Sequence, residues 1–356
     1  MPKEAVCLKI PKAEGEKAII LVSKLKIIDR ELEIQRNKNF IYVPLTSQPS
    51  EDALKTLQSQ IQEYEITTCA FQEKARKSRT IIEYLEGKLS PHLLASLPKA
   101  MDIVGDIAII EVPPELEKHK GLIGEAIIET HRNIKTVLAK AGAISGTYRL
   151  RELAVIAGEP KTATVHREYG CQYYVDLAKA YFSPRLSYEH HRIASQVKEG
   201  ETVIDMFAGV GPFSILIAKM RERVKVYAID INPEAVELLK RNIRLNRVEG
   251  KVYPMLGDAE GIIEKMFVEV ADRVIMNLPE KAIDFVVSAC RALKAAGGMI
   301  HFYSFVKPSE PLEDIKIRFA RVVEKSGRKL EKIHFSRLVR ETAPYEWQAV
   351  IDAEIR

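Results

Sequence analysis

The amino-acid sequence predicts an α/β fold in three parts: a small α/β segment, an α+β segment, and a larger parallel sheet with helices on both faces. The length of 356 residues fits two or three domains of about 150 residues each. Short strand-like runs follow one another between residues 148 and 176, as in an antiparallel sheet. From about residue 181 onward strand-like and helical runs alternate, which is typical of a doubly wound parallel sheet.

The first part contains two strand-like and two helical runs. They lie at residues 7–10, 14–24, 40–45 and 52–62. The polar stretch 72–79 has no strong apolar pattern and is interpreted as a linker. The domains are therefore predicted at residues 1–72, 73–178 and 179–356.

The second part mixes helices and strands. A helix is expected over 80–89, a strand with a Gly-Asp interruption over 103–112, and one or two amphipathic helices over 115–139. Short strands are expected at residues 148–152, 154–157, 162–168 and 171–176. This pattern predicts an α+β domain with an antiparallel sheet.

In the third part, helical runs separate successive strand-like runs. The strands are expected at residues 202–207, 224–229, 251–256, 273–276 and 298–303. Two further strands, 332–338 and 348–355, flank a loop that contains Pro344. These two strands predict an antiparallel hairpin at the edge of the parallel sheet.

Composition and charge narrow the functional class. Hydrophobic residues make up 46% of the chain and charged residues 29%, which fits a globular protein and excludes a disordered or fibrous one. No apolar run is long enough to span a membrane, and the four cysteines are scattered, so we expect a cytoplasmic protein without a metal site. The net charge of +5 includes basic clusters that favour a nucleic-acid partner, such as Lys74, Arg76, Lys77 and Arg79.

The turn after the first strand of the third part carries a functional signal. Asp205 ends the strand, Gly209 and Gly211 follow, and a helix is expected to begin at Pro212. Glycines let a ligand approach the backbone, and a helix N-terminus presents free N–H groups. A dinucleotide fingerprint requires a third glycine, but Ser214 stands in its place, which argues against NAD or FAD.

Polar residues also end the next three strands. Asp230 and Asn232 follow the second strand, Asp258 follows the third, and Asn277 follows the fourth. An acidic residue after the second strand can accept hydrogen bonds from two ribose hydroxyls, and one after the third can accept from an adenine amino group. Because the carboxyl ends of parallel strands meet at one edge of the sheet, we expect a shared ligand site there.

These motifs resemble the class I methyltransferases that use S-adenosylmethionine and, further, the archaeal and eukaryotic tRNA guanine-37 N1-methyltransferase family. The matching segments are Tyr-Arg-Leu-Arg-Glu-Leu at 148–153, Val-Asp-Leu-Ala-Lys-Ala-Tyr-Phe-Ser-Pro-Arg-Leu at 175–186, Asp-Met-Phe-Ala-Gly-Val-Gly-Pro-Phe-Ser at 205–214, Ala-Ile-Asp-Ile-Asn-Pro at 228–233 and Met-Asn-Leu-Pro at 276–279. The N-terminal part is similar to the small first domain of archaeal members, which contacts the outer corner of the tRNA. The resemblance implies a Rossmann-like class I methyltransferase sheet, S-adenosylmethionine as cofactor and tRNA as substrate.

The resemblance also implies roles for single residues. Glu189 matches the general base that removes the N1 proton of guanine, and Arg149 matches the arginine that stabilises negative charge on O6. Asn277 is counted with them as catalytic, and with Leu278 and Pro279 it is expected to shape the slot for the guanine edge. The expected cofactor-binding residues are Tyr181, Arg185, Asp205, Phe207, Gly209, Gly211, Asp230, Asn232, Asp258 and Asn277.

One departure from related motifs bears on the target atom. Relatives that methylate amino groups carry Asn-Pro-Pro-Tyr/Phe, whereas this chain has Leu278 and Glu280 in that motif, which favours a ring nitrogen. Three alternatives stay open: a wyosine-pathway aminocarboxypropyl transferase, a non-catalytic RNA-binding protein, and a nicotinamide dehydrogenase. Asp230, Glu189 and Asn277 favour methyl transfer over the first of these. We expect a monomer that needs no obligate protein partner and no membrane.

Overall fold

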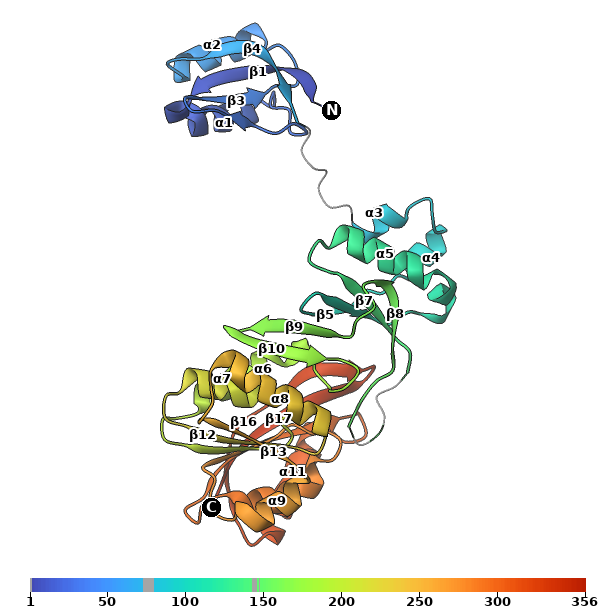
Figure 1. Ribbon diagram of the computed structural model, residues 1–356, viewed down its shortest axis with the longest axis vertical. Helices are drawn as coiled ribbons and strands as arrows, with labels where there is room; N and C mark the ends of the chain where they lie inside the picture. The colour runs from blue at the N-terminus through green and yellow to red at the C-terminus, as the bar shows by residue number, and fades with distance from the viewer. Residues whose placement is uncertain (1, 73–79, 143–145, 147) are drawn as a thin grey trace. The chain divides into compact units, whose positions relative to one another are not determined.

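The computed structural model describes residues 2–72, 80–142, 146 and 148–356 (Figure 1). The chain folds into two compact units, Met1–Thr80 and Ile81–Arg356. The predicted basic cluster of Lys74, Arg76, Lys77 and Arg79 lies outside the described residues. The division of the second unit at residue 178 stays a prediction.

The first unit is a four-stranded sheet with two helices. Its strand order is β2-β3-β1-β4, formed by β1 (Lys3–Pro11), β2 (Gln35–Arg36), β3 (Phe40–Pro44) and β4 (Glu65–Phe71). The helices α1 (Gly15–Lys24) and α2 (Glu51–Gln60) contribute Val22 and Leu57 to a core shared with Leu8 and Ile10. Strand β4 was not predicted, because only its last residue, Phe71, is fully buried and its apolar signal is weak.

The second unit begins with a mixed four-stranded sheet, in the order β5-β6-β7-β8. Its elements are α3 (Ile81–Leu85), α4 (Pro91–Ala95), β5 (Met101–Val104), β6 (Ile107–Ile110), α5 (Lys120–Thr130), β7 (Thr136–Lys140) and β8 (Leu153–Gly158). Strands β6 and β7 are parallel, while the other two pairs are antiparallel. Helix α5 packs against β7 and β8.

Three expectations for this region were wrong. The single strand over 103–112 is a hairpin that turns at Gly105, where φ is +56° and a Cβ atom would lie 2.6 Å from the carbonyl oxygen of Val165. The helix expected up to 139 ends at Thr130, because the buried, β-branched run that begins at Thr136 pairs as strand β7. The strand expected over 148–152 begins instead with a turn at Tyr148 and Arg149.

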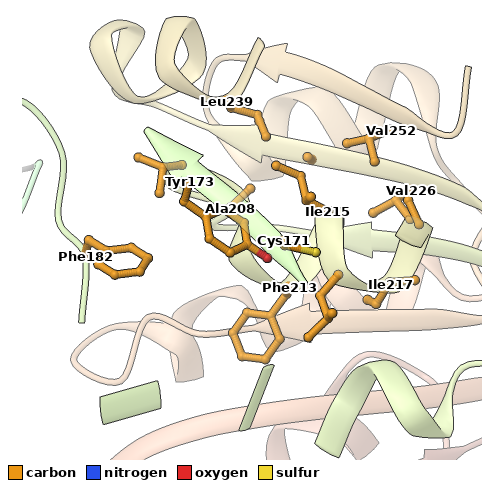
Figure 2. Close-up of a cluster of buried hydrophobic side chains, with 14 of the residues drawn as sticks. Cys171, Tyr173, Phe182, Ala208, Phe213, Ile215, Ile217, Val226, Leu239 and Val252 are labelled. Carbon is orange, nitrogen blue, oxygen red and sulfur yellow. The ribbon is translucent and has the colours of Figure 1, made fainter. Parts of the chain in front are cut away.

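An antiparallel hairpin, β9 (Ala163–Glu168) and β10 (Cys171–Asp176), packs through β10 on helices that cover the C-terminal sheet. Two side chains of helix α8 (Pro233–Asn246) hydrogen-bond the backbone of β10: Asn242 accepts from Tyr174 N at 2.7 Å and Asn246 from Gln172 N at 2.8 Å. These side chains accept hydrogen bonds from backbone N–H groups at the edge of β10 that would otherwise have no partner. Figure 2 shows Tyr173 in the same buried cluster as Phe213 and Leu239.

The C-terminal sheet has seven strands in the order β13-β12-β11-β14-β15-β17-β16. They are β11 (Thr202–Asp205), β12 (Lys225–Asp230), β13 (Val252–Leu256), β14 (Arg273–Met276), β15 (Gly298–Val306), β16 (Leu330–Ala343) and β17 (Glu346–Ile355). The first five in that order are parallel, and β17 and β16 form the predicted antiparallel edge hairpin. The predicted Rossmann-like fold is therefore confirmed.

Helices cover both faces of this sheet. One buried cluster contains residues of α6 (Ser187–Gln196), α7 (Pro212–Met220) and α8, and the other contains residues of α9 (Ala259–Met266), α10 (Val286–Ala292) and α11 (Leu312–Lys325). The strand order reverses direction between β11 and β14, and ligands bind such sheets at the carboxyl ends of the strands near that reversal. In the described parts of the chain no helix combines the length and apolar character needed to cross a membrane.

Candidate active site

A cavity of about 310 Å³ opens at the carboxyl ends of the parallel strands. It brings together most of the predicted site residues: Arg149, Tyr181, Phe207, Gly209, Asp230, Asn232, Asp258, Asn277, Leu278 and Pro279. Four other predicted residues do not line it: Arg185, Glu189, Asp205 and Gly211. The sequence-based set therefore divides into residues at the cavity and residues behind it.

The glycine turn is held against the end of the second parallel strand. The backbone N–H of Gly209 donates to Oδ2 of Asp230 at 2.7 Å, and both glycines have positive φ, +54° at Gly209 and +91° at Gly211. A Cβ atom on Gly211 would lie 2.3 Å from Cδ1 of Leu239, so that position requires glycine for packing as well as for conformation. Gly211 thus shapes the turn without lining the cavity.

Asp230 presents its carboxylate to the cavity while the backbone orients it. Besides Gly209, the N–H of Asn232 donates to Oδ1 of Asp230 at 2.8 Å. Burial raises the pKa of Asp230, although these backbone hydrogen bonds oppose that rise. Each oxygen keeps a further lone pair, so the carboxylate can accept the two hydroxyls of a ribose.

Asp205 lies behind the turn and supports it. The residue is fully buried, and its Oδ2 accepts a hydrogen bond of 2.7 Å from the hydroxyl of Ser214 on α7. Its Oδ1 has no hydrogen-bond partner among the described residues. Burial, together with the charge of Asp230, raises the pKa of Asp205 to about 7.

Three more predicted residues contribute to the cofactor half of the cavity in different ways. Asn232 caps α8 by accepting from Glu234 N at 3.0 Å, and Asp258 caps α9 by accepting from Gly261 N at 3.0 Å. Phe207 lines the cavity as an apolar surface, with its ring in an edge contact to Phe285, 5.1 Å between centroids. Asn232 is thus engaged in the fold, whereas Asp258 is exposed to the cavity.

Arg149 enters the cavity from the loop before β8. Its φ is +55°, and its Nη1 is buried without a hydrogen-bond partner among the described residues. The same nitrogen lies 3.6 Å from Oε2 of Glu280, and the guanidinium carbon lies 5.6 Å from the ring centroid of Tyr181. A buried donor that lacks an acceptor is costly in a folded protein and is typical of a group that serves a ligand.

A hydrogen-bonded chain from the edge hairpin reaches Asn277 in the cavity. Arg340 donates through Nε to Oε1 of Gln348 at 3.0 Å, and Gln348 donates through Nε2 to Oδ1 of Asn277 at 2.9 Å. The other two nitrogens of Arg340 donate to the hydroxyls of Ser183 and Tyr181. All five residues line the cavity.

Glu189 is held away from the cavity. The residue is 1% exposed, and its carboxylate accepts hydrogen bonds from Arg192, Arg337 and the hydroxyl of Tyr303. The next residue on α6, His190, lines the cavity instead, so the helix turns the predicted base and its neighbour to different sides.

His190 is fixed by a buried acid. Its Nδ1 lies 2.7 Å from Oε1 of Glu168 on β9, and Nε2 of His166 lies 3.7 Å from the second oxygen of that carboxylate. Burial alone would raise the pKa of Glu168, but the close His166 and the hydrogen bond with His190 outweigh it and hold the pKa at about 2. This contact ties the β9–β10 hairpin to α6.

Arg185 lines a second cavity of about 290 Å³ beside the first. Its Nε is hydrogen-bonded to Oδ1 of Asp102 on β5, so the side chain links the turn Pro184–Leu186 to the four-stranded sheet of this unit. The two cavities share a rim that includes Arg149, Tyr181 and Arg340.

Sequence reasoning missed several cavity residues. Gln348, Phe285 and Phe305 line the cavity but belong to no motif named above, and Ser183 lies in the matching segment that ends at Leu186 without a role assigned to it. Arg340 belongs to a basic cluster of the sequence with Arg328, Lys329 and Arg337, and such a cluster favours a nucleic-acid partner but does not predict a hydrogen-bonded chain. The strand pairing that places them at the site is not visible in the sequence.

Family models match most of the chain. The TRM5/TYW2 methyltransferase domain matches residues 164–336, the TYW2 N-terminal domain residues 81–162, and the tRNA methyltransferase 5 N-terminal domain residues 7–53. A relative from Pyrococcus abyssi, named tRNA (guanine(37)-N(1))-methyltransferase Trm5b, is 39% identical over 350 residues, which are 98% of this chain and 99% of the relative.

Solved structures agree with these matches. A complex of aTrm5 with tRNALeu has a TM-score of 0.78 at 35% identity, covering 99% of this chain and 100% of that chain. The M. jannaschii TYW2 bound to AdoMet has a TM-score of 0.55 at 30% identity, covering 72% of this chain and 99% of that chain. With a cavity of the expected composition and a relative of such identity over nearly its whole length, this chain belongs to the TRM5/TYW2 methyltransferase family.

Proposed function

We propose that this protein transfers a methyl group from S-adenosylmethionine to N1 of guanosine 37 in tRNA. One observation carries the proposal: a single cavity contains both a ribose-binding carboxylate, Asp230, and two hydrogen-bond donors, Arg149 and Asn277. The similarity to tRNA (guanine(37)-N(1))-methyltransferase relatives over nearly the whole chain supports it.

The residues present fit S-adenosylmethionine, which supplies the methyl group when bound. Asp230 is oriented by two backbone N–H groups to accept ribose hydroxyls, and the exposed carboxylate of Asp258 can accept from an adenine amino group. Gly209 leaves the backbone open to close approach, and Phe207 supplies an apolar surface. A nicotinamide dinucleotide fits less well, since Ser214 replaces the third glycine of its fingerprint.

The chemistry of guanine explains why donors are needed. N1 carries a proton at neutral pH, and its loss places negative charge on O6. A cation and an amide donor in a partly buried cavity stabilise that charge as it develops. Arg149, whose buried Nη1 has no acceptor among the described residues, is suited to O6. Leu278 and Pro279 line the slot beside it.

The general base has one sequence-based candidate and one structural one. Glu189 is the first, and it must leave Arg192, Arg337 and Tyr303 to reach a base in the cavity. Glu280 is the second, because it already lines the cavity beside Arg149. We retain Glu189 as the proposed base. Comparing a variant that lacks the Glu189 carboxylate with one that lacks the Glu280 carboxylate decides between the two candidates.

Aminocarboxypropyl transfer from the same cofactor is less favoured. The N-terminal unit matches the tRNA methyltransferase 5 N-terminal domain, whereas the TYW2 structure covers 72% of this chain. We further propose that the protein acts on tRNA as a monomer in the cytoplasm, without an obligate protein partner. Free thiols at all four cysteines are consistent with a reducing compartment.

Nucleoside analysis tests the function directly. Unmodified tRNA transcript is incubated with the purified protein and labelled S-adenosylmethionine, then digested and separated. The expected product is 1-methylguanosine from position 37, and a transcript with adenosine at 37 serves as the control. A nucleoside whose mass shows an added aminocarboxypropyl group would overturn the proposal. Labelling of the control transcript at the same rate would overturn it as well.

A further inference from the structure

We infer that Gln348 is a positioning residue that decides which end of the Asn277 side chain faces the target base. The inference rests on the proposed function. Gln348 lies on β17, is 2% exposed, and pairs across the hairpin with Arg340 on β16. It connects a fixed cation to the asparagine that follows β14.

The hydrogen bonds along this chain have only one possible direction. A guanidinium only donates, so the atom of Gln348 that lies 3.0 Å from Nε of Arg340 is the carbonyl oxygen. The amide nitrogen of Gln348 then faces Asn277 at 2.9 Å, and because it too only donates, it meets Oδ1. Arg340 is held in place, since its remaining nitrogens donate to Ser183 at 3.0 Å and to Tyr181 at 2.9 Å.

Asn277 is therefore left with a donor for the cavity. Its Oδ1 is engaged by Gln348, and none of the described residues accepts a hydrogen bond from its Nδ2. The slot then offers two donors, Nδ2 of Asn277 and the buried Nη1 of Arg149.

Two donors select for a particular kind of target. A guanine that loses its N1 proton gains negative charge on its Watson–Crick edge and is stabilised by donors. An exocyclic amine that must be methylated instead needs an acceptor for its N–H groups, and the acceptor of Asn277 is already engaged. Gln348 thus favours an anionic ring nitrogen over an amine without touching the substrate.

The substitution Gln348→Glu tests this by reversing the polarity. Glutamate keeps the size of glutamine and still accepts from Arg340, but its second oxygen can only accept from Asn277. Asn277 then turns its amide, donates Nδ2 to residue 348 and presents Oδ1 to the slot. The matched control, Gln348→Met, removes the hydrogen bonds without imposing an orientation on Asn277.

The main readout is which of the two variants methylates more slowly. In single-turnover methylation of guanosine 37, Gln348→Glu should be slower than wild type by on the order of 10²-fold, as for loss of an anion-stabilising donor. Gln348→Met should lose less. A purely structural role predicts the reverse order, because methionine leaves the partners on both sides unpaired. Affinities for S-adenosylmethionine and for tRNA should stay within about threefold, which is below 1 kcal/mol.

The pH profile gives an independent readout. Loss of the donor makes deprotonation of N1 harder, so the rate of Gln348→Glu should reach its plateau at higher pH than that of wild type. A deficit that is equal at every pH, or equal in both variants, overturns the inference. If Gln348→Glu does not fold, as judged by circular dichroism, Asn277→Asp makes the same polarity change directly, and wild-type activity in that variant would also overturn it. Absence of 1-methylguanosine with the wild-type protein would instead reject the proposed function.

Discussion

The hydroxyl of Tyr303 donates a hydrogen bond of 2.9 Å to Oε2 of Glu189, and this pair lies outside the cavity that the neighbouring His190 lines. Burial and the charge of Glu189 raise the pKa of Tyr303, so the phenol stays protonated and remains a donor. The carboxylate of the proposed base is thus held by Tyr303 and by two arginines, Arg192 and Arg337. Proton transfer from guanine requires that this arrangement opens.

The first prediction concerns the identity of the base. Glu189→Gln should slow single-turnover methylation by 10²- to 10⁴-fold near pH 7, typical for loss of a general base, and the deficit should shrink toward about pH 9 as hydroxide replaces it. Glu280→Gln, the matched control at the cavity, should stay within about tenfold of wild type. A pH-dependent deficit in Glu280→Gln with little effect of Glu189→Gln would transfer the role to Glu280.

The second prediction separates charge stabilisation from binding. Arg149→Ala should reduce the methyl-transfer step by on the order of 10²- to 10³-fold, as for removal of an oxyanion donor, with little change in tRNA affinity. Arg149→Lys keeps the positive charge but loses the planar fork, so its rate should lie between that of wild type and that of Arg149→Ala. Rapid-quench kinetics with saturating tRNA measures the methyl-transfer rate of both variants. Normal rates at saturation combined with weak tRNA binding would place Arg149 among the phosphate contacts.

The third prediction tests the cofactor half of the cavity. Asp230→Ala removes the acceptor for the ribose hydroxyls and the acceptor for Gly209 N, so affinity for S-adenosylmethionine should fall by about 1–3 kcal/mol. Asp284→Ala, an exposed carboxylate that does not line the cavity, is the control and should bind normally. Titration calorimetry compares them, and equal affinity in both variants would contradict the assignment of Asp230.

The fourth prediction concerns the N-terminal unit, Met1–Thr80. A protein lacking it should fold and bind S-adenosylmethionine with unchanged affinity, because all the described residues that line the cavity belong to the second unit. Affinity for whole tRNA should fall, while methylation of an anticodon stem-loop should not change. If the truncated protein preferred whole tRNA over the stem-loop as strongly as the full chain does, the unit would have no part in recognising tRNA shape.

The fifth prediction concerns stability and pH. Burial raises the pKa of Asp205 to about 7 in the folded protein, above the value of about 3.9 for an exposed aspartate. The folded state therefore binds the proton more tightly, and this contribution to stability is present at low pH and lost as the pH rises through about 7. The side chain in Asp205→Asn cannot ionise. The thermal midpoint of this variant, relative to that of wild type, should therefore rise between about pH 5 and about pH 8. If the difference between the two thermal midpoints stayed constant across that range, Asp205 would not be protonated in the folded protein.

Local sequence signals were sufficient for the cofactor turn. Gly209, Gly211 and Pro212 encode a left-handed turn followed by a helix start, and the structure has both. The alternation of strands and helices after residue 181 likewise predicted the parallel sheet, because each element carries its own periodicity. The pattern was less informative at Gly105, because the Gly-Asp interruption there fits a single interrupted strand as well as the hairpin that forms.

The sequence by itself determined the order of the elements and the residue types at the ends of the parallel strands, since these depend on neighbours along the chain. Only the tertiary structure decided which of those residues reach the cavity. Helix α6 turns Glu189 into a buried network and His190 toward the cavity, and the pairing of β16 with β17 brings Arg340 and Gln348 to Asn277 from more than 60 residues away. Such contacts depend on helix rotation and strand register, which are set by packing across the whole sheet and leave no local pattern in the sequence.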